Sequence, residues 1–73
     1  MKPIQQRILK RLADLRDGAT MCPGRLSRDC GSKLADARPD LLVLARAGKI
    51  VLSQGGKVAD PDALKGPFRV RLR

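Results

Sequence analysis

Hydrophobic residues recur at helical spacing over the first part of the chain. From Pro3 to Asp17 they fall at intervals of three and four, and polar residues occupy the other side. Proline suits the first turn of a helix and Gly18 suits the position just beyond its end, so the pattern predicts a helix over residues 3–17. The apolar stripe of this helix consists of Ile4, Ile8, Leu9, Leu12 and Leu15.

Two further helices are predicted before Gly48. The shorter one covers residues 23–30, opens with a proline and stops at a glycine. The other keeps helical spacing toward Gly48, yet Pro39 lies within it. Either a helix begins near Pro39 or a longer helix is kinked there, and the spacing favours helix over at least residues 40–47. Its apolar positions are Leu34, Ala37, Leu41, Leu44 and Ala45.

Beyond Gly48 the period changes to that of β-strands. A β-rich run at residues 50–52, a glycine turn and residues 57–58 together predict a hairpin. Asp60 and the proline after it predict a capped turn or a single helical turn, with Asp60 as its cap. Residues 68–73 alternate strictly, which places three apolar side chains on one face of a strand and three arginines on the other.

Three helices followed by a two- or three-stranded antiparallel ribbon form the element order of a winged helix-turn-helix. The predicted fold class is therefore α+β, in a single domain over residues 1–73, because a chain this short has no room for a second core. A three-helix bundle with a tail would look similar over the first fifty residues, but the closing strand favours the winged form. The central core residues are expected to be Leu12, Leu44 and Phe68.

The charge balance indicates a polyanionic partner. Sixteen Lys and Arg residues against seven Asp give a formal net charge of +9, while a hydrophobic content of 42% is ordinary for a folded chain. The sequence contains no His, Glu, Trp or Tyr. Without the common general bases we find no catalytic constellation, and we expect neither enzymatic activity nor a cofactor. The glycine pair 55–56 lacks the strand–loop–helix context of a phosphate loop and is interpreted as a turn.

Basic residues on the closing strand predict a nucleic-acid-binding surface. Arginines about 7 Å apart on one side of a strand can each displace a counterion from a phosphate backbone. The alternative interpretation is an edge strand that charge keeps soluble and unpaired. Arg25 and Arg28, with Lys33 beyond them, form a second basic cluster. The predicted binding residues are Arg25, Arg28, Arg46, Lys49, Lys57, Arg69, Arg71 and Arg73.

The outward side of the third helix argues against sequence-specific contacts in the major groove. If its leucines face the core, that side carries Asp36 and Asp40, which repel phosphates, and no Asn or Gln to bind an adenine edge. The same residues do not argue against recognition of the nucleic-acid backbone by the arginines, or against a partner that docks on Val43 and Ala47. We therefore expect a small transcriptional regulator that contacts the nucleic-acid backbone, with DNA favoured over RNA. The alternative is a homodimer or accessory subunit that presents a face to an acidic protein and binds no nucleic acid.

Cys22 and Cys30 are expected to remain thiols. If they share a helix they lie about 12 Å apart along its axis, which exceeds the roughly 7 Å that a disulfide permits. Cys22 is either a reactive thiol with a lowered pKa or a small core residue in register with Leu26 and Cys30, and the register favours the core. Two cysteines without histidine do not complete a zinc site, so no metal is expected. The chain has neither the apolar run of a secretory signal nor the roughly 20 apolar residues of a membrane span, so we expect a cytoplasmic location and no membrane partner.

Several short motifs cover most of the chain in a fixed order. They are Cys22-Pro23, Arg38-Pro39 before an Ala- and Leu-rich segment, Ala47-Gly48-Lys49-Ile50, Gln54-Gly55-Gly56-Lys57, Asp60-Pro61 and Gly66-Pro67-Phe68-Arg69-Val70-Arg71-Leu72. In these motifs the chain resembles the small bacterial proteins of domain of unknown function 3253. The resemblance implies a winged-helix-like fold. It implies no function, because the family has no established activity.

Overall fold

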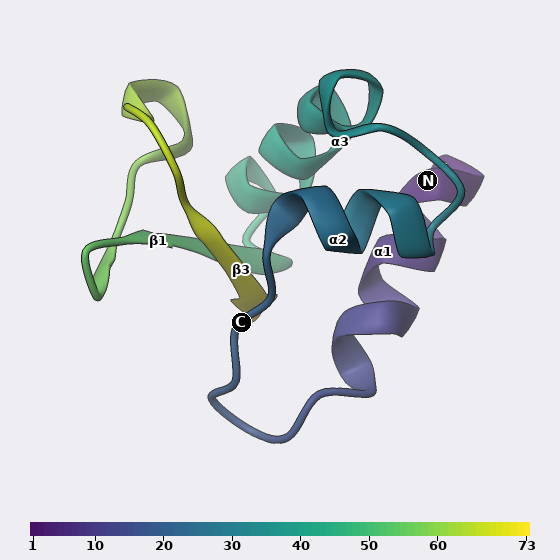
Figure 1. The fold of residues 1–73 in the computed structure, drawn as a ribbon, viewed down its shortest axis with the longest axis horizontal. Helices are drawn as coiled ribbons and strands as arrows, with labels where there is room; N and C mark the ends of the chain where they lie inside the picture. Colours follow the sequence, from purple (N-terminus) through teal and green to yellow (C-terminus); the bar gives the residue numbers. More distant parts are fainter.

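The computed structural model describes residues 1–73, in which three helices precede a small antiparallel sheet. The fold class is α+β, as the sequence predicts. In Figure 1 the three helices lie on one side of the molecule and the hairpin extends on the other. The elements are α1 (Pro3–Ala13), α2 (Pro23–Asp29), α3 (Leu34–Arg46), β1 (Ile50–Gln54), β2 (Lys57–Val58), the 3-10 turn η1 (Pro61–Ala63) and β3 (Arg69–Leu72).

Helix α1 ends at Ala13, so the predicted end at Asp17 is wrong. The chain tightens at this end, because the amide of Asp14 donates to the Arg11 carbonyl and that of Leu15 to the Leu12 carbonyl. Leu15 still packs against the core, which explains why the helical spacing extends past the helix itself. Gly18, with φ of +81°, belongs to a separate turn in the loop between α1 and α2.

Helix α3 begins at Leu34 and continues through Pro39, so the longer of the two alternatives is the correct one. Pro39 has no amide hydrogen to donate to the carbonyl of Ala35. Both residues are exposed, so water can solvate that carbonyl. Helix α2 ends at Asp29, and Cys30 caps it. None of the three helices combines the length and apolar character needed to cross a membrane.

The sheet has the order β2-β1-β3, with both pairs antiparallel. The turn between β1 and β2 contains Gly55 and Gly56 at φ of +57° and +80°, which a tight hairpin of this kind requires. On the far side of β3, Met21 forms a bridge with Val70 through backbone hydrogen bonds of 2.8 and 3.0 Å. The sequence did not predict this bridge, because a single residue has no strand periodicity. It places the end of the α1–α2 loop alongside β3.

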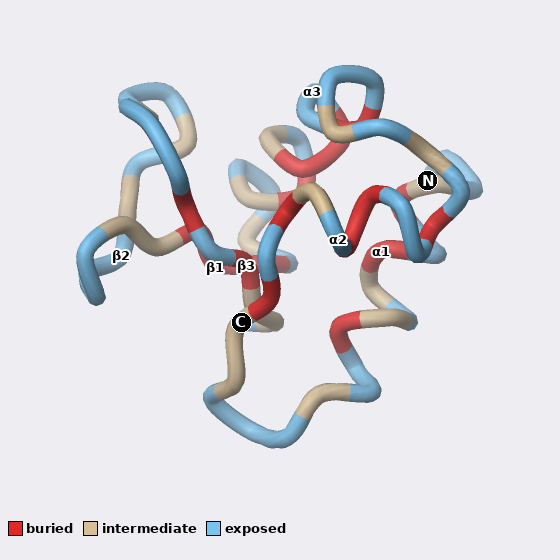
Figure 2. Tube along the Cα trace, viewed as in Figure 1, coloured by how far each residue is buried: buried red, intermediate tan, exposed pale blue.

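The core lies where the helices face one another and the inner face of the sheet. Figure 2 shows the buried stretches gathered there, with exposed backbone on the outer turns and the hairpin tip. Leu12, Leu44 and Phe68 are only 2, 1 and 5% exposed, which confirms the predicted core. The other members of the buried cluster are Ile8, Met21, Leu26, Cys30, Leu41, Ile50, Leu52 and Val70.

Asp40 is buried, and the prediction that it lies on the outward side of α3 is wrong. Helix α1 packs over this position, and the side-chain amide of the buried Gln5 donates to a carboxylate oxygen of Asp40 at 3.0 Å. The Lys2 ammonium lies 3.8 Å from the same oxygen. Asp36 is therefore the acidic residue left on the exposed side of α3.

Candidate nucleic-acid interface

Strand β3 separates its arginines from its apolar residues, as the alternation predicts. Phe68 and Val70 are buried, whereas Arg69 and Arg73 are exposed and Arg71 is half-buried. Pairing with β1 places Arg69 opposite Ser53 and Arg71 opposite Val51. Arg69 and Arg71 therefore share one face of the sheet, opposite to the buried Val70, and Arg73 follows directly after β3.

Arg69 is held in place by the loop that precedes α2. Its Nε donates to Thr20 Oγ1 at 3.1 Å and its Nη2 donates to the Thr20 carbonyl at 3.2 Å. Thr20 directly precedes Met21, so the Met21–Val70 bridge brings this partner to β3. A guanidinium has five N–H groups, and three remain available to an anion after these two bonds are made. No spacing in the sequence indicates this contact, because 49 residues separate its partners.

Cys22 is exposed, so the favoured prediction of a core cysteine is wrong. Pro23 takes the buried position at the start of α2, and Cys22 precedes the first turn. Hydrogen bonds from the backbone amides of Arg25 and Gly24 lower the pKa of the thiol, and the nearby charges of Arg69 and Arg28 lower it further. The charges of Arg28 and Arg69, from α2 and β3, therefore lie near Cys22, and Arg25 lines the same hollow as Cys22 and Arg69. Both Cys22 and the buried Cys30 are free thiols.

Arg38 joins this region from α3 and is absent from the predicted set. Its guanidinium carbon lies 5.6 Å from the centre of the Phe68 ring, within the range of a cation–π contact. A cleft of about 550 Å³ runs beside this pair and reaches Arg69 and Cys22. The sequence does not single out Arg38 among the exposed arginines, because its partner Phe68 lies on a distant strand.

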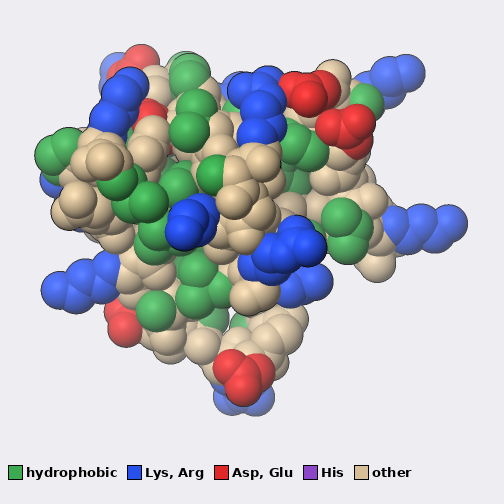
Figure 3. Space-filling model, turned by 180° about the vertical axis from the view of Figure 1, so that it is seen from behind, with side chains coloured by type: hydrophobic (Ala, Val, Ile, Leu, Met, Phe, Trp, Pro, Cys, Tyr) green, Lys and Arg blue, Asp and Glu red, His purple; other side chains and the backbone are tan.

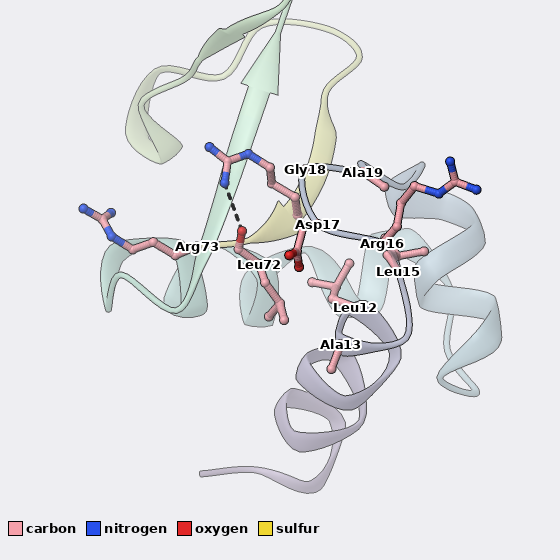
Figure 4. A pocket seen from close by; sticks show the side chains of 10 residues that line it. Leu12, Ala13, Leu15, Arg16, Asp17, Gly18, Ala19, Leu72 and Arg73 are labelled. Atoms are coloured by element: carbon pink, nitrogen blue, oxygen red, sulfur yellow. Dashed lines mark hydrogen bonds between the residues drawn. The ribbon is translucent and has the colours of Figure 1, made fainter.

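Arg71 and Arg73 border a different cleft, which lies between the end of α1, the following loop and β3 (Figure 4). Leu12 and Leu72 point toward the middle of this cleft, whereas Arg73 points away from it. A guanidinium N–H of Arg71 donates to the Leu72 carbonyl at 3.0 Å. Lys49 is close by, since its carbonyl accepts from the Arg73 amide.

Arg46 and Lys57 lie apart from these groups. Arg46 on α3 forms an ion pair with Asp62 of η1, with its Nε 2.8 Å from the carboxylate. Lys57 is exposed on β2, at the hairpin turn. The predicted binding residues thus fall into a group around Cys22, a group at the free end of β3, and these two outlying positions.

A family model described as Protein of unknown function (DUF3253) matches residues 1–73. The chain belongs to this family. The match confirms the resemblance seen in the motifs, of which Cys22-Pro23 lies at the start of α2 and the stretch from Gly66 to Leu72 contains β3. A comparison with curated proteins found no match.

Most of the positive charge of this DUF3253 chain has no acidic neighbour. Of the sixteen Lys and Arg side chains, only those of Lys2, Arg11, Arg25 and Arg46 have a carboxylate within 4.0 Å. Asp29 is shared, at 3.1 Å from Arg11 and 3.9 Å from Arg25. On the face shown in Figure 3, Lys and Arg side chains stand both near the middle and around the rim, whereas acidic side chains stand mainly toward the rim. No group of three or more potential metal-ligating side chains occurs.

Proposed function

We propose that this chain is a cytoplasmic winged-helix domain that binds nucleic acid, DNA in preference to RNA, through its phosphate backbone, and acts as a small transcriptional regulator. The order of elements supports the winged-helix interpretation. The Met21 bridge adds a short extended segment between α1 and α2, and β1 and β3 follow α3 as the two long strands. In such domains the last helix of the trio and the hairpin approach the duplex together.

The observation that carries the proposal is the outward row of arginines on β3, next to the basic residues of α2. Arg69 and Arg71 share one face of the sheet, Arg73 follows directly after β3, and none of these side chains forms an ion pair within 4.0 Å. Arg69 is already fixed by Thr20, so less side-chain entropy is lost when it contacts a phosphate. Arginine suits this role because its planar donors match phosphate geometry.

The composition of α3 argues against base contacts by this helix and leaves the backbone contacts to the arginines of β3 and α2. The exposed side of α3 carries Asp36 and no Asn or Gln, which removes the usual side chains for adenine and places a negative charge toward the phosphates. Backbone contacts position a protein on the duplex without reading its sequence. We therefore expect similar affinity for unrelated duplexes of the same length.

The test is titration of a fluorescent duplex of random sequence at low and moderate salt, with Arg73→Ala as the variant. Arg73 is exposed and its side chain has no hydrogen-bonding partner, so the substitution removes charge without disturbing the fold. We expect weaker binding on every sequence and a salt dependence reduced by about one unit of slope. Lys10→Ala, on the exposed side of α1, is the control of equal charge and should retain the native slope.

Two results would overturn the proposal. A loss that depends on the base sequence would exclude the backbone mechanism. Absence of duplex binding at low salt would exclude nucleic-acid binding by this surface, and it would favour the alternative of a protein-interaction module. In that case the exposed Val43 of α3, at 47% exposure, would be the first position to substitute in a search for a protein partner.

A further inference from the structure

The cleft between α2, α3 and β3 is lined by apolar residues together with two arginines. It measures about 550 Å³ and is bordered by Cys22, Leu34, Arg38, Pro67, Phe68 and Arg69. Apolar side chains form much of its wall, and two guanidinium groups stand at its border. No acidic residue lines it. A ligand for this cleft must therefore combine an apolar, preferably flat part with a negative charge.

The Arg38–Phe68 pair supplies a surface for a flat group. The Phe68 ring is buried, and the Arg38 guanidinium lies over it at 5.6 Å. Arg38 is itself exposed and lines the cleft, so Phe68 leaves part of its side chain accessible to a flat group. Guanidinium planes in this setting stack on unpaired nucleobases.

Arg69 supplies the site for a negative charge on the same cleft. Two of its five N–H groups bind Thr20, which fixes the guanidinium and leaves three donors for an anion. The charge of Arg25 adds to the positive potential nearby, because Arg25 and Arg69 line the adjoining hollow that also contains Cys22. A phosphate at Arg69 and a base at Arg38 would occupy the cleft together.

We propose that the α2–α3–β3 cleft holds one unpaired nucleotide of a nucleic-acid strand, with its phosphate at Arg69 and its base stacked on Arg38. This inference rests on the proposed nucleic-acid binding and specifies it further. A base inside a duplex is stacked between its neighbours and does not reach the cleft without being extruded. The cleft therefore favours an overhang or a single strand over a blunt duplex.

Cys22 provides a reporter within the native chain. It borders the cleft and is exposed, whereas Cys30 is buried and serves as the internal reference. A nucleotide bound in the cleft covers the Cys22 thiol and slows its alkylation. At a ligand concentration about ten times the Kd, the alkylation rate should fall about tenfold.

The experiment measures alkylation of both cysteines by N-ethylmaleimide with four probes at matched ionic strength. The probes are a blunt duplex, the same duplex with a single-stranded overhang, adenosine monophosphate and inorganic phosphate. A duplex bound through Arg69 and α2 also covers part of the surface around Cys22. We therefore expect both oligonucleotides to slow the alkylation of Cys22, and the overhang to slow it clearly further at equal occupancy. Binding of each oligonucleotide is followed separately by fluorescence anisotropy.

Every other outcome overturns the cleft proposal. Binding of the overhang with no more protection of Cys22 than the blunt duplex gives overturns the cleft proposal and leaves the proposed function standing. Equal protection by inorganic phosphate shows an anion site without base stacking and overturns it as well. Protection by adenosine monophosphate but not by the overhang shows a free-nucleotide site. Absence of binding by every oligonucleotide overturns both proposals.

A matched pair of variants isolates the role of Arg38. Arg38→Gln removes the stacking surface, and Lys10→Gln removes the same charge from the exposed side of α1. Arg38→Gln should abolish the added protection by the overhang and bind the blunt duplex as Lys10→Gln does. Equal protection in the two variants would overturn the assignment of Arg38. The circular dichroism of both variants should match the native chain.

Discussion

The side chain of Cys22 lies outside the core, although the helical register of the sequence favours a buried position. Pro23, which follows it, occupies the buried position at the start of α2, and Cys22 lies outside with its thiol near backbone amides and two arginines. Those amides stabilise the thiolate, and so do the charges of Arg69 and Arg28. Cys30 lies at the other end of the same helix, where burial raises the pKa of its thiol.

The two cysteines should therefore differ in their pH dependence. The thiolate is the nucleophile, so a lowered pKa makes Cys22 react at a lower pH than an ordinary cysteine, and a raised pKa delays Cys30 to a higher pH. Alkylation rates of the two peptides, measured by mass spectrometry across the pH range, test this order. Identical pH profiles, or a Cys30 that reacts first, would contradict the described environments.

Asp40 and Gln5 form the buried polar contact between α1 and α3. Asp40→Ala would leave the Gln5 amide buried without its partner, which costs about 1 to 3 kcal/mol of unfolding free energy. Thermal unfolding of this variant should show a clear loss. Asp36→Ala, on the exposed side of the same helix, should change stability by no more than about 0.5 kcal/mol. Equal losses from the two substitutions would show that Asp40 is not engaged as described.

At the scale of elements, the contact between α3 and η1 engages one of the predicted binding residues. Arg46 and Asp62 form an ion pair in which both side chains are at least half exposed. Such pairs contribute little to stability, typically about 0 to 1 kcal/mol. Their effect on binding is expected to be larger, because the carboxylate occupies donors that a phosphate would otherwise use.

Asp62→Asn should therefore strengthen nucleic-acid binding while leaving thermal stability nearly unchanged. Part of any gain comes simply from the more positive net charge. Asp14→Asn, at an exposed position without an ion pair, measures that part alone. A larger gain in duplex affinity for Asp62→Asn places Arg46 in the interface, and equal gains would remove Arg46 from it.

Periodicity in the sequence predicted the type of every helix and strand, and it failed at specific ends. Leu15 packs against the core from a loop, so the apolar stripe overstated the length of α1. The proline within α3 left its start open, since local sequence does not show whether water can solvate the carbonyl it leaves unpaired. The Met21 bridge escaped prediction because its partner, Val70, is distant in sequence.

The candidate site was predictable only as far as it depends on local pattern. Strict alternation predicted the burial of Phe68 and Val70 and the exposure of Arg69, which the structure confirms, whereas Arg71 and Leu72 are both half-buried and Arg73 lies beyond the strand. The contacts that fix Arg69 on Thr20 and Arg38 on Phe68 join distant segments, and no spacing in the sequence indicates them. The exposure of Cys22 follows from the burial of its neighbour Pro23, which the helical register alone does not show.

At the scale of the whole molecule, a single cluster of buried side chains joins all three helices to β1 and β3. Phe68 is the only aromatic residue in the chain, and it lies where the last segment closes over that cluster. A chain this small has a low free energy of unfolding, since native domains typically have only about 5 to 15 kcal/mol.

Phe68→Ala should abolish cooperative unfolding at ambient temperature. Truncation of a buried phenylalanine costs about 3 to 5 kcal/mol, which is comparable with the whole stability of such a domain. Thermal unfolding followed by circular dichroism measures this directly. Val58→Ala, at a valine that is 74% exposed, should retain the native transition. A sharp transition in Phe68→Ala would show that the ring is peripheral to the core.

The net charge of +9 and the outward arginines lead to one central claim, that the molecule binds nucleic acid through phosphates. The most direct test is the affinity of the native chain for a duplex of random sequence, plotted as log K against log salt. If five to eight basic residues contact phosphates, the slope should be about −4 to −7. No binding at low salt, or an affinity that salt leaves unchanged, would contradict the claim.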